Sequence, residues 1–78
     1  MGVMTLSEYT AKRGAMKVFL IDSGLAHSTV RNLMHGERFA SIAVAVRIEQ
    51  ATGGAVSAES VVSPEHLPVI AYLRRQHA

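Results

Sequence analysis

A run of polar side chains at helical spacing lies near the middle of this 78-residue chain. Ser28, Arg31, Asn32 and His35 recur at intervals of three and four, so a helix would carry them on one face, with His27 at its start. Arg can pair with guanine and Asn with adenine in the major groove of DNA. These five residues are therefore predicted to contact bases of duplex DNA, with an ordinary solvated surface as the alternative for each.

Cations and a hydroxyl around this run predict contacts with the phosphate backbone. The residues assigned to this role are Lys17, Thr29 and Arg38. Lys12 and Arg13 extend the same positive edge. For Arg47 two roles stay open, a phosphate contact or an ion pair with Glu37 or Glu49.

The segment from Met16 to Gly36 is predicted to hold these side chains as two short helices joined by a tight turn at Gly24. The first helix is expected over Ala15 to Ser23. The second begins near Ala26 to Ser28, where Ser28 can serve as its cap, and ends at His35–Gly36. The apolar residues spaced to meet between the two helices are Phe19, Leu25, Val30 and Leu33.

Two further helices flank this unit. Thr5 and Glu8 form a capping box for a helix running to about Arg13, with Gly14 as its C-cap, while Met1 to Met4 are expected to be frayed. Tyr9 on that helix either packs in the core or touches phosphate. After the first 36 residues, Phe39 is expected to fold back into the core. Ser41 is expected to cap a helix over Ile42 to Thr52, which Gly53–Gly54 ends.

The C-terminal part of the chain predicts a short helical turn capped by Ser57 and a new helix start at Ser63–Pro64–Glu65, which Pro68 breaks or restarts. An apolar stripe then follows, formed by Val69, Ile70 and Leu73. It serves either as a dimer interface or as a docking contact with its own domain. Arg74 and Arg75 either touch the DNA backbone or form a solvated tail. We expect residues 1–62 to be the DNA-binding domain and 63–78 its helical extension.

Composition narrows the class of protein. Hydrophobic residues make up 49% of the chain, there is no Cys, and the net charge is +2. The hydrophobic content predicts a folded chain, and the lack of Cys predicts no disulfide or thiolate metal site. With the helices expected above and no strand of clear period two, we expect an all-α bundle of four to five helices. The longest apolar run, Val18 to Ile21, is far short of the roughly 20 residues of a membrane span. No nucleophile–base pair, phosphate loop or His pattern for metal is present, so we expect no enzyme activity, cofactor or small-molecule ligand.

Several motifs of the chain resemble the YdaS-like, Cro-type helix-turn-helix regulators of bacteria and their phages. The resemblance covers about Leu6 to Val62 and is carried by LSEY, Ser28-Thr29-Val30, Gly36-Glu37-Arg38 and the run RIE followed by ATGGAV. The chain departs from the family pattern at Leu20, where Ala is usual, at Ser23, where an apolar residue is usual, and at Ala26, where a capping Ser is common. The resemblance implies a lambda-repressor-like domain that binds an operator as a dimer.

The expected function is therefore that of a transcriptional regulator, specifically a repressor, which is cytoplasmic and associated with the nucleoid. Two copies would place their recognition helices about 34 Å apart on a near-palindromic site of double-stranded DNA. The alternative is a small helical protein-interaction module, such as an antirepressor or a toxin–antitoxin component.

Overall fold

A computed structural model describes residues 4–77 of the chain, which form helices joined by short loops. The elements are α1 (Leu6–Tyr9), α2 (Ala15–Ser23), α3 (His27–Met34), α4 (Ile42–Ala51), the short 3-10 turns η1 (Ala58–Ser60) and η2 (Pro64–His66), and α5 (Leu67–His77). The predicted all-α class is confirmed. None of the helices over residues 4–77 is long and apolar enough to cross a membrane.

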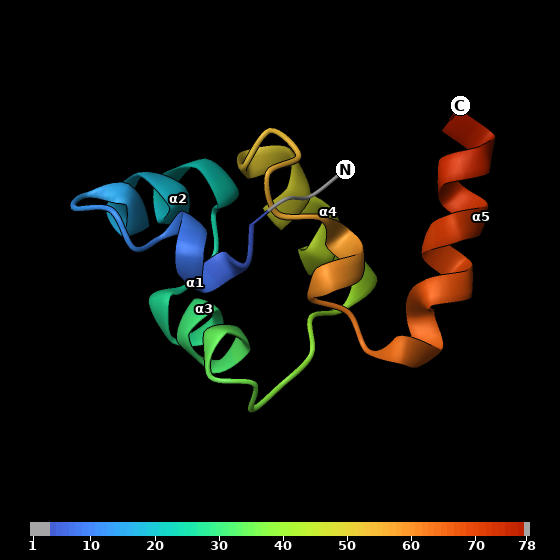
Figure 1. Cartoon of the computed structure of the whole chain (residues 1–78), viewed down its shortest axis with the longest axis horizontal. Helices are drawn as coiled ribbons and strands as arrows, with labels where there is room; N and C mark the ends of the chain where they lie inside the picture. The colour runs from blue at the N-terminus through green and yellow to red at the C-terminus, as the bar shows by residue number, and fades with distance from the viewer. Residues whose placement is uncertain (1–3, 78) are drawn as a thin grey trace.

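Helix α4 lies in the middle of the molecule (Figure 1). It packs against α2 on one side and against η1 on the other. Helices α1, α2 and α3 gather at one end, and α5 stands at the opposite end, in contact with η1 and η2. The candidate DNA-reading helix and the C-terminal helix are therefore separated by α4.

The core is small and is built around a few fully buried side chains. The largest of these are Phe19, Ile48, Val30 and Val56. The ring of Tyr9 meets Phe19 edge to face, with 6.1 Å between centroids, so the core role predicted for Tyr9 is confirmed. Leu25 and Leu33 pack against this cluster from its edge and remain partly buried, as expected for residues between α2 and α3.

The first helix is shorter than predicted. The capping box of Thr5 and Glu8 is present in both directions, but α1 ends at Tyr9 and not near Arg13. The hydroxyl of Thr10 donates to the Leu6 carbonyl at 2.9 Å, which gives a buried polar side chain its partner at the helix end. Gly14 consequently serves as the N-cap of α2 and not as the C-cap of α1.

The N-terminal end was predicted to be frayed. Residues 1–3 lie outside the described part of the chain. Met4 is held in place, because its amide donates to the Ala55 carbonyl at 3.0 Å. The prediction that Met4 is frayed is therefore wrong.

The run from Glu49 to Val56 closes α4 and begins the return of the chain. Ser41 caps the start of α4 as predicted, and the helix ends one residue before the predicted Thr52. The Thr52 hydroxyl donates to the Ile48 carbonyl at 2.9 Å and accepts from the Val56 amide at 3.1 Å. The Gly54 amide donates to the Glu49 carbonyl, which satisfies one of the last carbonyls of the helix.

The loop between α3 and α4 overturns one prediction. Phe39 is 66% exposed and does not fold into the core. Its neighbour Ala40 is buried instead and forms an isolated parallel bridge with Val62. Because successive residues of extended backbone point to opposite sides, burying Ala40 turns Phe39 outward.

Helix α5 docks on its own chain through one apolar residue and one cation. Ile70 is only 3% exposed, so this member of the predicted dimer stripe is used within the chain, while Val69 and Leu73 remain at the surface. Pro68 falls in the first turn of α5, where it restarts the helix after η2.

Arg74 is part of a charged bridge and not of a solvated tail. Its guanidinium pairs with Glu49 of α4 and with Glu59 of η1, where Nε donates to Glu59 at 2.6 Å. Glu49 also accepts from the Ala58 amide at 2.9 Å. The hydrogen bonds from Arg74 lower the pKa of both carboxyl groups below the ordinary value of 4.5. Arg74 thus ties together three segments that are distant in sequence.

We predict that replacement of Arg74 by Met destabilises the protein in a pH-dependent way. The Glu49 and Glu59 pKa values are lowered on folding, so their stabilising contribution is present above the ordinary value of 4.5 and is lost as the pH falls through the lower folded values. The difference in free energy of unfolding between wild type and Arg74→Met should shrink accordingly. Urea titrations followed by circular dichroism from pH 7 to pH 3 measure it.

The matched control is Arg75→Met, which changes the neighbouring residue outside the bridge. This variant should show no such pH dependence. Because the bridge is partly exposed, the effect should also weaken in high salt. A wild type-to-Arg74→Met difference that is constant down to pH 3 would show that the ion pairs contribute nothing to the docking of α5.

Candidate nucleic-acid interface

The turn between α2 and α3 sets the direction of the candidate reading helix. Gly24 has a φ of +70°, a left-handed conformation that side chains with a Cβ disfavour, and its amide donates to the Leu20 carbonyl at 3.0 Å. Ser23 is buried, and its hydroxyl accepts from the Leu25 amide at 3.3 Å. The polar side chain at position 23 therefore closes the turn.

Helix α3 begins one residue after an extended Ala26, which contributes no side-chain cap. Ser28 lies inside the helix, so the prediction that it caps α3 is wrong. Its hydroxyl is consequently left on the exposed surface of the first turn. Val30 is the one fully buried residue of α3, and it anchors the helix to the core.

The polar face of α3 borders a shallow hollow. Four of the five residues predicted to contact bases line it, together with a carboxylate; they are Ser28, Arg31, Asn32, His35 and Glu37. Asn32 is half-buried, and the other four are exposed. The structure thus gathers donors, acceptors and a cation on one accessible surface of a helix about 12 Å long.

Glu37 also belongs to this surface, although from the sequence its only expected role was as an ion-pair partner of Arg47. The Glu37 amide donates to the Asn32 carbonyl at 3.0 Å, and the Gly36 amide donates to the Leu33 carbonyl at 3.2 Å. With Gly36 at a φ of +72°, these bonds turn the chain sharply at the end of α3. The sequence His35–Gly36–Glu37 could have predicted this position of Glu37, because the residue after the Gly returns toward the helix.

His27 is separated from the other predicted base contacts. It lines a different hollow, formed with Lys17 and with the apolar side chains of Met16, Leu20 and Ile21. His27 is exposed at the first turn of α3, and Lys17 is exposed in the first turn of α2. The structure therefore places His27 with a predicted phosphate contact, at the junction of α2 and α3.

The remaining predicted phosphate contacts lie at the two ends of the reading helix. Thr29 is exposed in the first turn of α3, and Arg38 is exposed in the loop that follows it. Together with Lys17, they come from three consecutive elements, which are α2, α3 and the loop after α3. Among residues 4–77 neither Lys17 nor Arg38 forms an ion pair.

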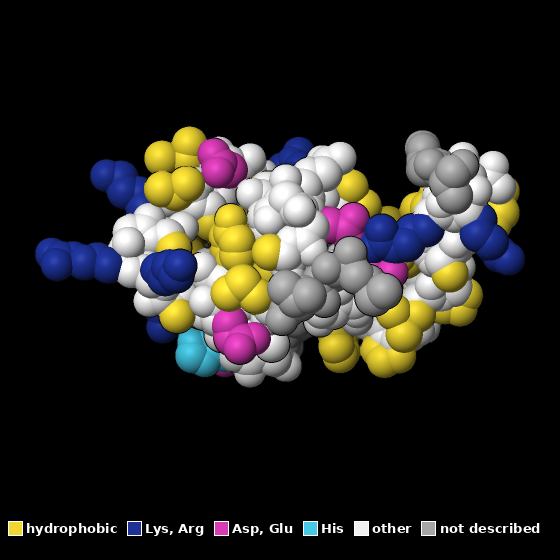
Figure 2. All heavy atoms as spheres, turned by 45° about the horizontal axis from the view of Figure 1, so that its top comes forward, with side chains coloured by type: hydrophobic (Ala, Val, Ile, Leu, Met, Phe, Trp, Pro, Cys, Tyr) yellow, Lys and Arg dark blue, Asp and Glu magenta, His cyan; other side chains and the backbone are white. Residues whose placement is uncertain are grey.

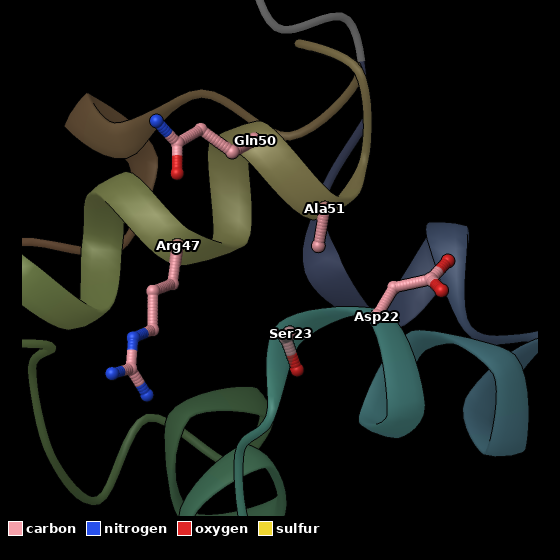
Figure 3. Close-up of a pocket in the computed structure, with 5 residues that line it drawn as sticks. All are labelled: Asp22, Ser23, Arg47, Gln50 and Ala51. Carbon is pink, nitrogen blue, oxygen red and sulfur yellow. The ribbon is translucent and has the colours of Figure 1, made fainter.

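Arg47 extends from α4 toward the end of α2 and the turn (Figure 3). Its guanidinium lies 4.0 Å from the position that a Cβ on Gly24 would take. It shares a hollow with Asp22, Ser23, Gln50 and Ala51. Within residues 4–77 the carboxylate of Glu49 pairs with Arg74, and Arg47 is in an ion pair with neither Glu37 nor Glu49. The Arg47 guanidinium lies at the C-terminal end of α2, where its positive charge interacts favourably with the helix dipole.

We predict that Gly24→Ala lowers the free energy of unfolding by about 1–2 kcal/mol, the cost of placing an ordinary residue in the left-handed region. The nearest atom to the added Cβ is at an ordinary contact distance, so the loss comes from the backbone and not from a clash. Gly24→Asn is the matched control, because Asn tolerates this conformation better. Chemical denaturation measures both. An equal loss in both variants would indicate that crowding at the turn, and not its φ, is the cause.

Comparison of the chain with models of protein families, with curated proteins and with solved structures finds no match. The geometry of α2, the turn and α3, and the chemistry of the side chains that they present, are therefore the basis for proposing a function.

Proposed function

We propose that this protein is a sequence-specific, double-stranded-DNA-binding transcriptional regulator that acts as a repressor on the nucleoid in the cytoplasm. The observation that carries the proposal is the polar hollow on α3, where Ser28, Arg31, Asn32 and His35 gather directly after a tight helix-turn-helix junction. A single α-helix fits the major groove of B-DNA, and these side chains would face the base edges.

Each residue of the hollow has a defined chemical capacity. Arg31 offers paired donors suited to guanine O6 and N7, and Asn32 offers the donor and acceptor suited to adenine N6 and N7. Ser28 and His35 can donate to either a base or a phosphate. Glu37 can accept from the amino group of cytosine, and its charge disfavours a phosphate at the same place. The hollow therefore has groups for more than one kind of base pair.

Backbone contacts would hold α3 in register. Because Ala26 supplies no side-chain cap, the first amides of α3 are left for an anion such as a phosphate. Thr29 lies at the same helix end, and Lys17 and Arg38 add a cation before and after α3. Arg47 of α4, whose guanidinium lies beside the end of α2, helps to position the turn in this arrangement.

A dimer is part of the proposal, since one unit of this size reads too few base pairs for selectivity. Helix α5 carries an outward apolar stripe of Val69, Tyr72 and Leu73, which are 43%, 54% and 36% exposed. These three residues recur at helical spacing beside buried Ile70, and Leu73 also borders a hollow that Ile70 and Val46 line. Pairing through this stripe leaves α3 of each copy free for DNA.

Arg31→Ala and Arg38→Ala should affect DNA binding differently. Loss of a base contact by Arg31 should cost about 1–3 kcal/mol and relax specificity at one base pair. Loss of a phosphate contact by Arg38 should weaken binding to all sequences evenly and reduce the slope of log affinity against log salt by about 1. Selection of binding fragments from random DNA gives the site, and anisotropy titrations over a salt series give both quantities.

Arg75→Ala, which removes a cation at the other end of the molecule, is the control for net charge. It should leave the site and its affinity nearly unchanged. Selection that recovers no preferred sequence, or an affinity of the wild type that does not fall with salt, would exclude the proposed function.

Replacement of Val69 and Leu73 by Ser should convert a dimer into a monomer and weaken operator binding. Both side chains are exposed within one chain, so the fold should be retained. Sedimentation equilibrium measures the mass, and the selected DNA site should lose its two-fold symmetry. Phe39→Ser is the control, because it removes a comparable exposed side chain at another place. A wild-type mass of one chain at tens of micromolar would rule out the α5 dimer.

A further inference from the structure

Helix α2 is apolar on its outer face as well as its inner one. Phe19 points into the core, yet Ile21 is 71% exposed and Val18 57% exposed. Both are β-branched residues in the middle of a regular helix, so neither is needed to cap or end it. An exposed apolar ridge of this kind on a small protein is typical of a contact surface.

Recesses lie on both sides of this ridge. On one side Ile21 borders a hollow with Met16 and Leu20. On the other, Val18 borders a hollow that reaches Tyr9 and Phe19. The apolar surface is thus continuous with the edge of the core, and a partner can insert side chains on either side of Val18 and Ile21.

Cations rim the same surface. Lys12, Arg13 and Lys17 line the two hollows and are exposed, and in the part of the chain that the structure describes none of them forms an ion pair. Figure 2 shows Lys and Arg side chains projecting at the end of the molecule where hydrophobic side chains also reach the surface. Asp22 follows Ile21 and lies four residues after Val18, so the surface carries three cations and one carboxylate and stays positive overall.

The exposed aliphatic residues and the cations around them restrict which kind of molecule can bind this surface. A second copy placed on the same ridge would bring like charges together, which is unfavourable. DNA would satisfy the cations but would leave Val18 and Ile21 against phosphate. A protein segment with an apolar face flanked by carboxylates would satisfy both features, because its side chains can fill the hollows while its acidic groups meet Lys12 and Arg13.

We infer that the outer face of α2, formed by Val18 and Ile21 and rimmed by Lys12, Arg13 and Lys17, docks an acidic amphipathic segment of a second protein. This interaction does not depend on DNA. Because Lys17 and His27 border the same hollow, a bound segment also lies beside the proposed phosphate contacts. Occupancy of the ridge is therefore expected to compete with DNA.

Synthetic peptides test the chemistry directly. The probe is a fluorescent amphipathic helix with Leu on one face and Glu on its flanks, and its control has Lys in place of Glu. The full chain should bind the Glu peptide, and Ile21→Ser and Val18→Ser should each weaken binding about tenfold, since each loses one buried aliphatic contact. Arg13→Gln should weaken binding and reduce its salt dependence. Val46→Ser, at an exposed apolar residue of α4, is the control and should bind as the wild type does.

Three outcomes would overturn the inference. They are equal binding of the Lys peptide, no measurable binding of the Glu peptide, and binding that Ile21→Ser leaves unchanged. Vesicles of phosphatidylglycerol form a further arm, and binding to them that needs Ile21, without binding of the peptide, would assign the ridge to a membrane surface instead. All of these binding measurements are made without DNA, so their result is independent of whether an operator exists.

A photo-crosslinking residue at position 21 extends the test to cells. Since Ile21 is exposed, the substitution should not disturb the fold, which circular dichroism verifies. The cross-linked segment of the captured protein should be apolar and acidic. Capture of a basic segment, or of another copy of this chain, would contradict the inference.

Discussion

The burial of α4 is the constraint on which the rest of this molecule depends. Ala45 and Ile48 are fully buried, and α4 has the α2–α3 unit on one side and η1 on the other. A domain of this size has a small core, so only a few buried side chains hold its segments together. The same helix also carries Glu49, which connects it to α5 through Arg74, and Arg47, which reaches the turn at Gly24. Loss of packing around Ile48 would therefore release both ends of the molecule at once.

Local contacts fix the position of the proposed reading surface. Helix α3 has one fully buried side chain, Val30, so its position depends strongly on its two ends. Gly24 and Ser23 fix the start, and the hydrogen bonds that follow Gly36 fix the end. The polar side chains between these ends need make no internal contacts. They can present their hydrogen-bonding groups outward without cost to the fold.

Local signals predicted most of the fold, and long-range contacts account for the failures. Gly24, Ser41 and the Gly53–Gly54 pair have conformational or capping roles that neighbours in sequence decide, so α2 and α4 were predicted to within one residue. Phe39 was misplaced because its direction depends on the bridge between Ala40 and Val62, which are distant in sequence. The partners of Arg74 lie 15 and 25 residues away and have no periodic signal. At the candidate interface, periodicity predicted the shared face of α3, whereas the separation of His27 from it depends on how α2 crosses α3.

The placement of α5 across α4 from α3 has an evolutionary consequence. Residues that face outward on α3 can change without altering the contacts of α5, and the outward stripe of α5 can change without altering α3. In a dimer joined by α5, the sequence of each half-site and the distance between half-sites would be inherited as two separable traits. Descendants of such a protein could acquire new target sequences at a fixed spacing, or new spacings for a fixed sequence, by substitutions in only one of the two helices.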